Sequence, residues 1–109
     1  MRALIIILIS LLTSVQVYAE QKYFYCEIRS LDGTYLDVAR WGKGTDFKYN
    51  SAKKRWEWES SYSDQYIYPD GRYVQYGKHV GFDDQKGHCG SSAEQKYKQN
   101  LEIIIRKYQ

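Results

Sequence analysis

Histidine and cysteine are the residue types in this sequence best suited to metal binding or nucleophilic chemistry, and each occurs only twice. His88 adjoins Cys89, and His79 lies earlier in the chain. A zinc site needs three or four such ligands at a recognisable spacing, so the sequence predicts no metal site and no cofactor. The pair Asp83-Asp84 is not followed by the acidic residues and glycine of a calcium-binding loop.

Nucleophilic catalysis needs a nucleophile, a base and a group that orients the base. The sequence has no G-x-S-x-G motif and no cysteine left over to pair with a histidine. A hydrolase that combines His79 or His88 with Glu57 or Glu59 stays open, because such sites are assembled in space. We therefore expect no catalytic residues, and keep a small secreted enzyme or toxin as an alternative.

A basic run, Lys53-Lys54-Arg55, precedes Trp56 and Trp58 and resembles an aromatic and basic surface for single-stranded nucleic acid. However, Glu57 and Glu59 alternate with the tryptophans. The whole sequence has 16 basic and 13 acidic side chains, which is not the strongly basic balance of a nucleic-acid-binding domain. The pattern favours a basic turn followed by a strand whose tryptophans are in the core, with no nucleic-acid partner.

Aromatic residues are unusually frequent, with 12 tyrosines and 3 tryptophans among 109 residues. On a rigid β scaffold, flat aromatic faces stack on sugar rings or anchor protein interfaces. Strand alternation places Tyr23 and Tyr25 opposite Phe24, and Tyr73 opposite Val74. One aromatic face of these hairpins should therefore be exposed, which favours a binding function.

The N-terminus reads as a cleavable secretory signal peptide, residues 1–19. Arg2 precedes an apolar run over residues 3–12, and small side chains at Val17 and Ala19 suit cleavage after Ala19. Ser10 and Thr13 interrupt the run before it could span a membrane. We expect an exported protein, periplasmic or secreted, with no membrane association after cleavage.

The mature chain, residues 20–109, has the length of a single domain, and a domain of this size needs a further constraint. Cys26 and Cys89 are the only cysteines, and the compartment reached after export is oxidising. They predict one disulfide, which stabilises the fold by about 4 kcal/mol in the chain-entropy model.

Strand-forming segments separated by turns recur along the mature chain. Alternation puts Phe24, Cys26 and Ile28 on one face, and Leu36 and Val38 inward. The predicted strands are 22–29, 34–40, a short one around 47–49, 55–59, 66–68, 72–76, 79–83 and a well-buried 101–108. Residues 60–65 and 84–90 are expected to be loops, and a short helix over 94–99 is expected after Ser91 and Ser92. The fold class is mainly β: a small antiparallel meander closed as a barrel or sandwich, with one short helix before the last strand.

Tyr25-Cys26, the stretch 68–78 (YPDGRYVQYGK) and Cys89 are similar in layout to the periplasmic C-type lysozyme inhibitors. That family is a small β-barrel with one disulfide and a comparable hairpin ending near a lysine. The resemblance implies that Ser61, Tyr68 and Lys78 lie near a surface that plugs an enzyme cleft. Two departures are the absence of the family's Ser-Gly pair, where residues 61–63 (SYS) stand, and the 20 residues after Cys89.

The leading hypothesis is a small inhibitor or immunity protein that blocks a cell-wall hydrolase or toxin through the hairpin tip. The predicted binding residues are Ser61, Tyr68, Asp70, Gly71, Tyr73 and Lys78. The first alternative is a carbohydrate-binding module that uses Trp56 or Trp58. The partner is therefore expected to be a protein or, in the alternative, a glycan.

Overall fold

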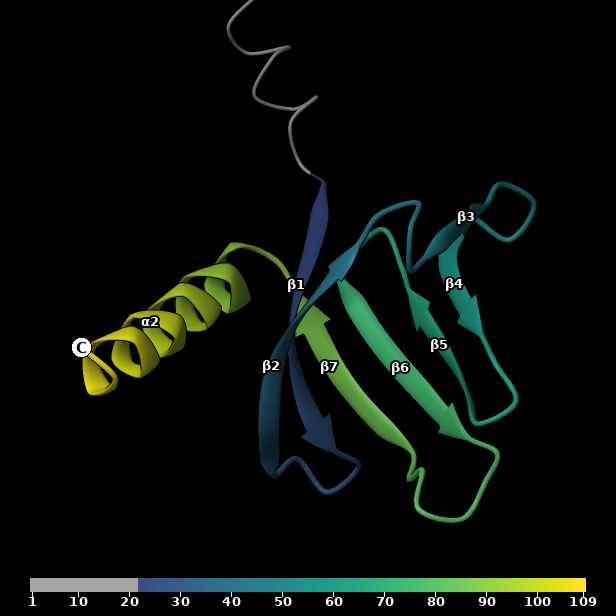
Figure 1. The fold of residues 1–109 in the computed structure, drawn as a ribbon. Helices are drawn as coiled ribbons and strands as arrows, with labels where there is room; N and C mark the ends of the chain where they lie inside the picture. Colours follow the sequence, from purple (N-terminus) through teal and green to yellow (C-terminus); the bar gives the residue numbers. More distant parts are fainter. Residues whose placement is uncertain (1–21) are drawn as a thin grey trace, which may run out of the picture.

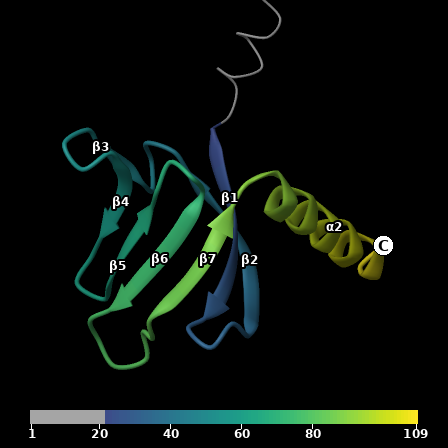
Figure 2. The ribbon, with the colours of Figure 1, turned by 180° about the vertical axis from the view of Figure 1, so that it is seen from behind.

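The computed structural model describes residues 22–109, so the predicted signal peptide lies outside the described residues. Seven antiparallel strands form one sheet with the order β2-β1-β7-β6-β5-β4-β3, and a single helix follows the last strand (Figures 1 and 2). The elements are β1 (Tyr23–Ser30), β2 (Tyr35–Gly42), β3 (Lys48–Asn50), β4 (Arg55–Glu59), β5 (Ser63–Ile67), β6 (Arg72–Gly77), β7 (Gln85–Cys89) and α2 (Ser91–Lys107). Within residues 22–109, no helix combines the length and apolar character needed to cross a membrane.

The sheet curls into a half-barrel rather than closing, so the mainly β class is confirmed and the closed barrel is not. Its two edge strands, β2 and β3, are joined by the short segment 43–47. This segment carries Phe47, which is fully buried, into the hollow of the curled sheet. The ring of Phe47 lies 5.8 Å from that of Phe24, 5.5 Å from that of Trp41 and 5.6 Å from that of Trp58. A side chain of this chain thus fills the hollow between the two edges.

The predicted disulfide is present and fixes the middle of the sheet. Cys26 and Cys89 are bonded and directly opposite in the β1–β7 register. This pairing brings residues 85–89 into the sheet as β7, whereas we expected a loop there and a strand over 79–83. Lys86 and Gly87 have weak strand propensity, and their pairing with β1 and β6 outweighs it.

The C-terminal prediction is wrong: residues 101–108 form no buried strand, and the expected short helix instead runs from Ser91 to Lys107. No glycine or proline interrupts residues 91–109, and isoleucine disfavours a helix by only a few tenths of a kcal/mol. Ile103, Ile104 and Ile105 remain exposed, and the end of α2 projects beyond the sheet (Figure 1).

Strand alternation in β1 is confirmed, with Cys26 and Ile28 buried and Phe24 packed against the core. In β2 the expectation fails for Leu36, which is exposed. Ile28 pairs with Asp37 and Arg29 pairs with Tyr35, so Leu36 is the extra residue of a β-bulge. Val38 is buried, but on the outer face rather than on the expected inner face. It pairs with Glu27 and lies on the same face as that residue, where α2 packs against the sheet.

Candidate functional site

The turn between β5 and β6 forms as the sequence predicts and carries Tyr68, Asp70 and Gly71. Gly71 has φ +93°, a conformation that glycine adopts without strain. The Asp70 carboxylate accepts a hydrogen bond from the Arg72 amide at 3.0 Å. The Cys89 amide donates to the Gly71 carbonyl at 2.7 Å, so the turn is tied to the disulfide end of β7.

Tyr73 is not available to a partner, because its side chain is 1 % exposed. The expectation that Tyr73 is an exposed anchor is therefore wrong. Its ring points into the half-barrel, where Trp41 lies 5.1 Å away, and its hydroxyl donates to Gln65 Oε1 at 2.9 Å. Burial raises the pKa of the Tyr73 hydroxyl above its ordinary value. Tyr73 fills part of the inner face, where the buried core has only a few aliphatic side chains.

Lys78 and Ser61 lie at the opposite end of β6 from the turn. The Lys78 amide donates to the Tyr62 carbonyl at 2.8 Å, and its ammonium pairs with Asp64 at 3.1 Å. The six residues of β6 separate this end from Gly71, a span of about 20 Å at the usual rise of a strand. The predicted binding residues therefore divide between two ends of the sheet instead of forming one surface.

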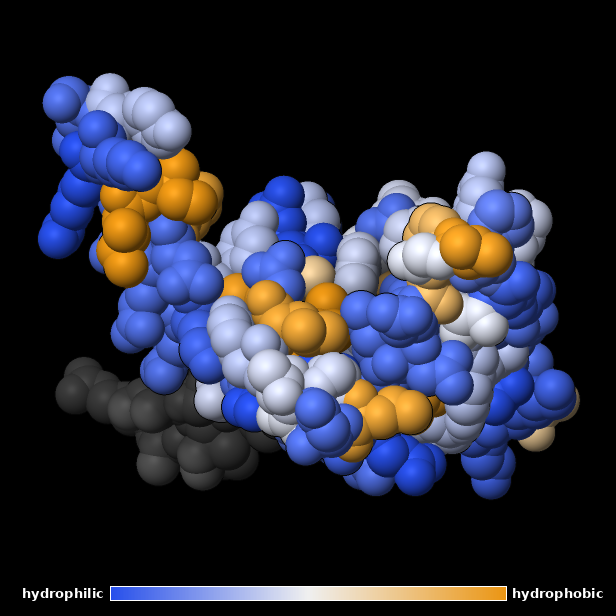
Figure 3. Space-filling view, turned by 90° about the horizontal axis from the view of Figure 1, so that it is seen from below, coloured by the Kyte–Doolittle hydropathy of each residue, from blue (hydrophilic) through white to orange (hydrophobic). Residues whose placement is uncertain are grey.

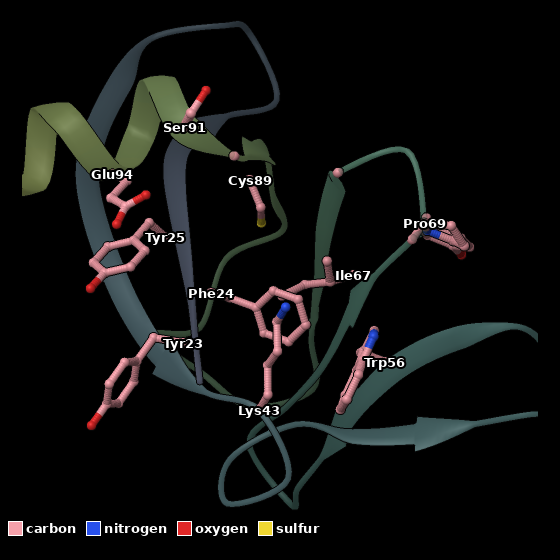
Figure 4. Close-up of a pocket in the computed structure, with 13 residues that line it drawn as sticks. Tyr23, Phe24, Tyr25, Lys43, Trp56, Ile67, Pro69, Cys89, Ser91 and Glu94 are labelled. Carbon is pink, nitrogen blue, oxygen red and sulfur yellow. The ribbon is translucent and has the colours of Figure 1, made fainter. Parts of the chain in front are cut away.

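A cleft of about 340 Å³ opens beside Tyr68 and Gly71, at the mouth of the half-barrel. Figure 4 shows Phe24, Lys43 and Ile67 close together, with Trp56 beside them and Pro69 farther out. The rings of Phe24 and Trp56 are 5.2 Å apart in an edge-to-face arrangement. Tyr23 and Tyr25 also border the cleft, but they point to the other side of β1, where Arg40 and Tyr97 contact them.

Polar groups from the segment 43–47 and from α2 border the same cleft. The Lys43 ammonium lies 4.7 Å from the centre of the Phe24 ring, a favourable cation–π position. Ser91 and Glu94, in the first turn of α2, also line the cleft, and Figure 4 shows Glu94 beside Tyr25. The Glu94 carboxylate also pairs with Lys98 at 3.1 Å on the helix surface. The cleft therefore combines aromatic carbon with donors and acceptors of hydrogen bonds.

Side chains on the outer face hold Tyr68 in place. The Tyr68 hydroxyl lies 3.3 Å from Arg55, and the Arg72 guanidinium lies 4.2 Å from the Tyr68 ring centre. Arg55 pairs with Glu57 at 2.7 Å. Hydrogen bonds from Asn50 and Arg55 lower the pKa of Glu57, and the bond to Glu57 raises the pKa of Arg55.

A second group of aromatic side chains lies at the far end, around Ser61 and Lys78. The ring of Tyr62 stacks on that of Phe82 at 5.2 Å and meets the imidazole of His79 at 5.6 Å. Val80, in the loop between β6 and β7, is 93 % exposed. We call Tyr62, His79, Val80 and Phe82 the loop-end cluster.

The two histidines lie apart. His79 is in the loop-end cluster, whereas His88 is on the outer face between Glu27 and Arg72. In the part of the chain that the structure describes, no three histidine, cysteine, aspartate or glutamate side chains come together as a metal site. Glu57, one of the acids considered for a hydrolase, is held by Arg55 and Asn50.

Sequence reasoning found part of the cleft and missed the rest. The sequence predicts Tyr68 and Gly71 as binding residues, and the carbohydrate alternative includes Trp56; all three line the cleft. Phe24 was assigned to the core, and nothing in the sequence pointed to Lys43 or Glu94. The disulfide was the available signal, since joining Cys26 to Cys89 brings β1 beside the start of the helix. The chain matches no protein-family model, no curated protein and no solved structure.

Proposed function

We propose that this protein is an exported, non-catalytic binding protein that takes a glycan into the cleft beside Tyr68. One observation carries the proposal: Phe24 and Trp56 line the same cleft as Lys43, Ser91 and Glu94. Sugar rings present apolar C–H faces to aromatic rings and hydroxyls to charged and polar groups. Export is supported by the Cys26–Cys89 disulfide, since such bonds persist in oxidising compartments.

The size of the cleft supports a small ligand portion rather than a bulky one. Its volume of about 340 Å³ is at the lower end of small-molecule sites, which run from about 300 to 1,000 Å³. A sugar unit at the end of a longer glycan fits this volume. By contrast, the hairpin is a poor plug for an enzyme cleft, because Tyr73 is buried and Lys78 lies at the other end of β6.

The test is a calorimetric titration of oxidised residues 20–109 with N-acetylchitotetraose, together with retention on purified peptidoglycan. Glu94→Gln keeps the shape of the side chain and removes a charged acceptor, so we expect about tenfold weaker binding. Trp56→Leu removes the ring and should weaken binding between about twofold and tenfold. Lys53→Gln, in the exposed turn before β4, is the matched control and should bind as the parent does.

The loop-end cluster supports a second candidate function, the docking of a protein. Tyr62, Val80 and Phe82 are exposed beside Ser61 and Lys78, and aromatic side chains are frequent anchors of protein interfaces. The same bait distinguishes the two functions. A single protein retained from periplasmic extract, lost with Phe82→Ser and kept with Trp56→Leu, would favour docking. No retention on glycan and no heat of binding would reject the glycan proposal.

A further inference from the structure

A second hollow lies on the outer face of the sheet, on the other side of the strands from the half-barrel core. It is a groove of about 450 Å³ between the first turn of α2 and strands β1, β6 and β7. Its lining includes Arg29, Arg72, Lys86, His88, Val74 and Ala93. We call it the outer groove.

The strand register places the basic side chains of the outer groove next to one another. Lys86 is directly opposite Arg29 on one side and Val74 on the other, and His88 is directly opposite Arg72. Directly paired residues in antiparallel strands share a face and lie close, so the like charges of Lys86 and Arg29 repel. A bound anion would relieve this repulsion.

Acidic side chains do not balance the outer groove. Among the described residues, Glu27 is the one carboxylate that lines it, and Arg29 and Lys96 both pair with Glu27. Across residues 22–109, neither Arg72 nor Lys86 makes an ion pair with a carboxylate. Arg72 and Lys86 thus remain outside any ion pair among these residues. Arg72 is held over the Tyr68 ring, and the charge of Lys86 contributes to lowering the pKa of the Asp32 carboxyl.

The rest of the lining favours a ligand that is partly apolar. Val74, Gly87 and Ala93 contribute carbon surface between the charged groups. Ser92 and Ala93 belong to the first turn of α2. Gly90, the residue before the helix, provides no side-chain cap for that turn. The positive end of the helix dipole therefore adds to the basic side chains.

We propose that the outer groove binds an amphiphilic anion: a phosphate or carboxylate group attached to an apolar chain or ring. Arg72 and Lys86 hold the anionic group, and the apolar part lies over Val74 and Ala93. This site is separate from the glycan cleft, which opens beside Phe24 and Trp56, and the two proposals do not depend on each other. Arg72 contacts Tyr68, a residue at the rim of the cleft, so the outer groove lies directly behind it.

The experiment is an NMR titration of ¹⁵N-labelled, oxidised residues 20–109 with hexyl phosphate. Inorganic phosphate and hexyl glucoside serve as probes for the anionic and the apolar part alone. We expect hexyl phosphate to shift the amide signals of residues 86–88, 92 and 93, and each partial probe to bind at least tenfold more weakly. The double variant Arg72→Gln/Lys86→Gln should bind hexyl phosphate at least tenfold more weakly, whereas Lys53→Gln should bind it as the parent does.

Sedimentation with vesicles identifies the source of the anion. Retention on phosphatidylglycerol vesicles but not on phosphatidylcholine vesicles, lost in the double variant, would assign a lipid headgroup. Binding of hexyl phosphate without retention on vesicles would assign a free amphiphile. The proposal is overturned if hexyl phosphate leaves residues 86–88 unshifted, or if hexyl glucoside binds equally well. It is also overturned if Lys53→Gln loses as much affinity as the double variant while both keep the parent melting temperature.

Discussion

The inner and outer faces of the sheet are both rich in aromatic rings, but the rings have different neighbours on the two faces. On the inner face, Phe24, Phe47 and Trp58 pack against other aromatic rings at 5.2–5.8 Å. On the outer face, Tyr66 and Tyr68 pack against the guanidinium groups of Arg55 and Arg72 at 3.8 Å and 4.2 Å.

This difference shows that the abundance of aromatic residues has two structural causes before it has a functional one. Inner rings replace the leucines that this core lacks, and outer rings support arginines on a half-exposed surface. Trp56 lies beside the cleft and Phe82 is exposed in the loop-end cluster, whereas the inner rings of Phe47 and Tyr73 are buried. A count of tyrosines and tryptophans therefore overestimates the binding surface.

The largest expected effect is on the inner face, with Phe47→Ala. Phe47 is fully buried and contacts three other aromatic rings, so its removal leaves a cavity that the curled sheet cannot fill. We expect the free energy of unfolding to fall by about 3–5 kcal/mol, measured by guanidinium denaturation of the oxidised protein. Tyr49→Ala, whose ring also packs on a tryptophan but is exposed, is the control and should have a much smaller effect. Equal effects would mean that packing of Phe47 in the hollow of the half-barrel does not stabilise the fold.

Elements whose own residues determine them could be predicted from the sequence. The strand Arg55–Glu59 has the predicted bounds, because its alternation of tryptophan with charge fits a half-buried strand. The turn at Pro69-Asp70-Gly71 also forms as predicted, because proline and glycine preset its backbone angles.

Elements determined by their partners could not be predicted. Strand β7 contains glycine and histidine, and it exists because β1, β6 and the disulfide hold it. Residues 101–107 have the composition of a strand, yet they continue the helix that begins at Ser91. The same holds for the cleft. Tyr68 and Trp56 are binding candidates in the sequence, whereas Lys43 and Glu94 reach the cleft only through tertiary contacts.

A smaller effect is expected on the outer face, with Glu57→Gln. The hydrogen bonds that lower the pKa of Glu57 favour the folded state while the carboxylate is ionised. This stabilisation is complete above the ordinary glutamate pKa of about 4.3 and is lost as the pH falls through the lowered value. Unfolding at pH 7 should therefore require about 1 kcal/mol less in the variant, and its stability should decline less on acidification.

The control for this prediction is Glu59→Gln, on the same strand and the same face. Glu59 is exposed and makes no ion pair within the described residues. Its removal should leave both the stability at pH 7 and its decline on acidification close to those of the parent. If Glu59→Gln reproduces the effect of Glu57→Gln, the outer face is stabilised by net charge rather than by the contacts of Glu57.

The smallest expected effect is at the projecting end of α2, which extends the outer face past the strands. Figure 3 shows apolar surface on this end of the helix, away from the strands, and Ile104 is 53 % exposed. Because the isoleucine contacts water in the single chain, Ile104→Gln should change the free energy of unfolding by less than about 0.5 kcal/mol. Val38→Ala is the buried comparison beneath the same helix and should lower stability by about 1.5 kcal/mol at 0.8 kcal/mol per buried methylene. Both variants should be measured at several protein concentrations. If Ile104→Gln lowers the free energy of unfolding, and lowers it more at higher protein concentration, a second copy of the chain covers this surface.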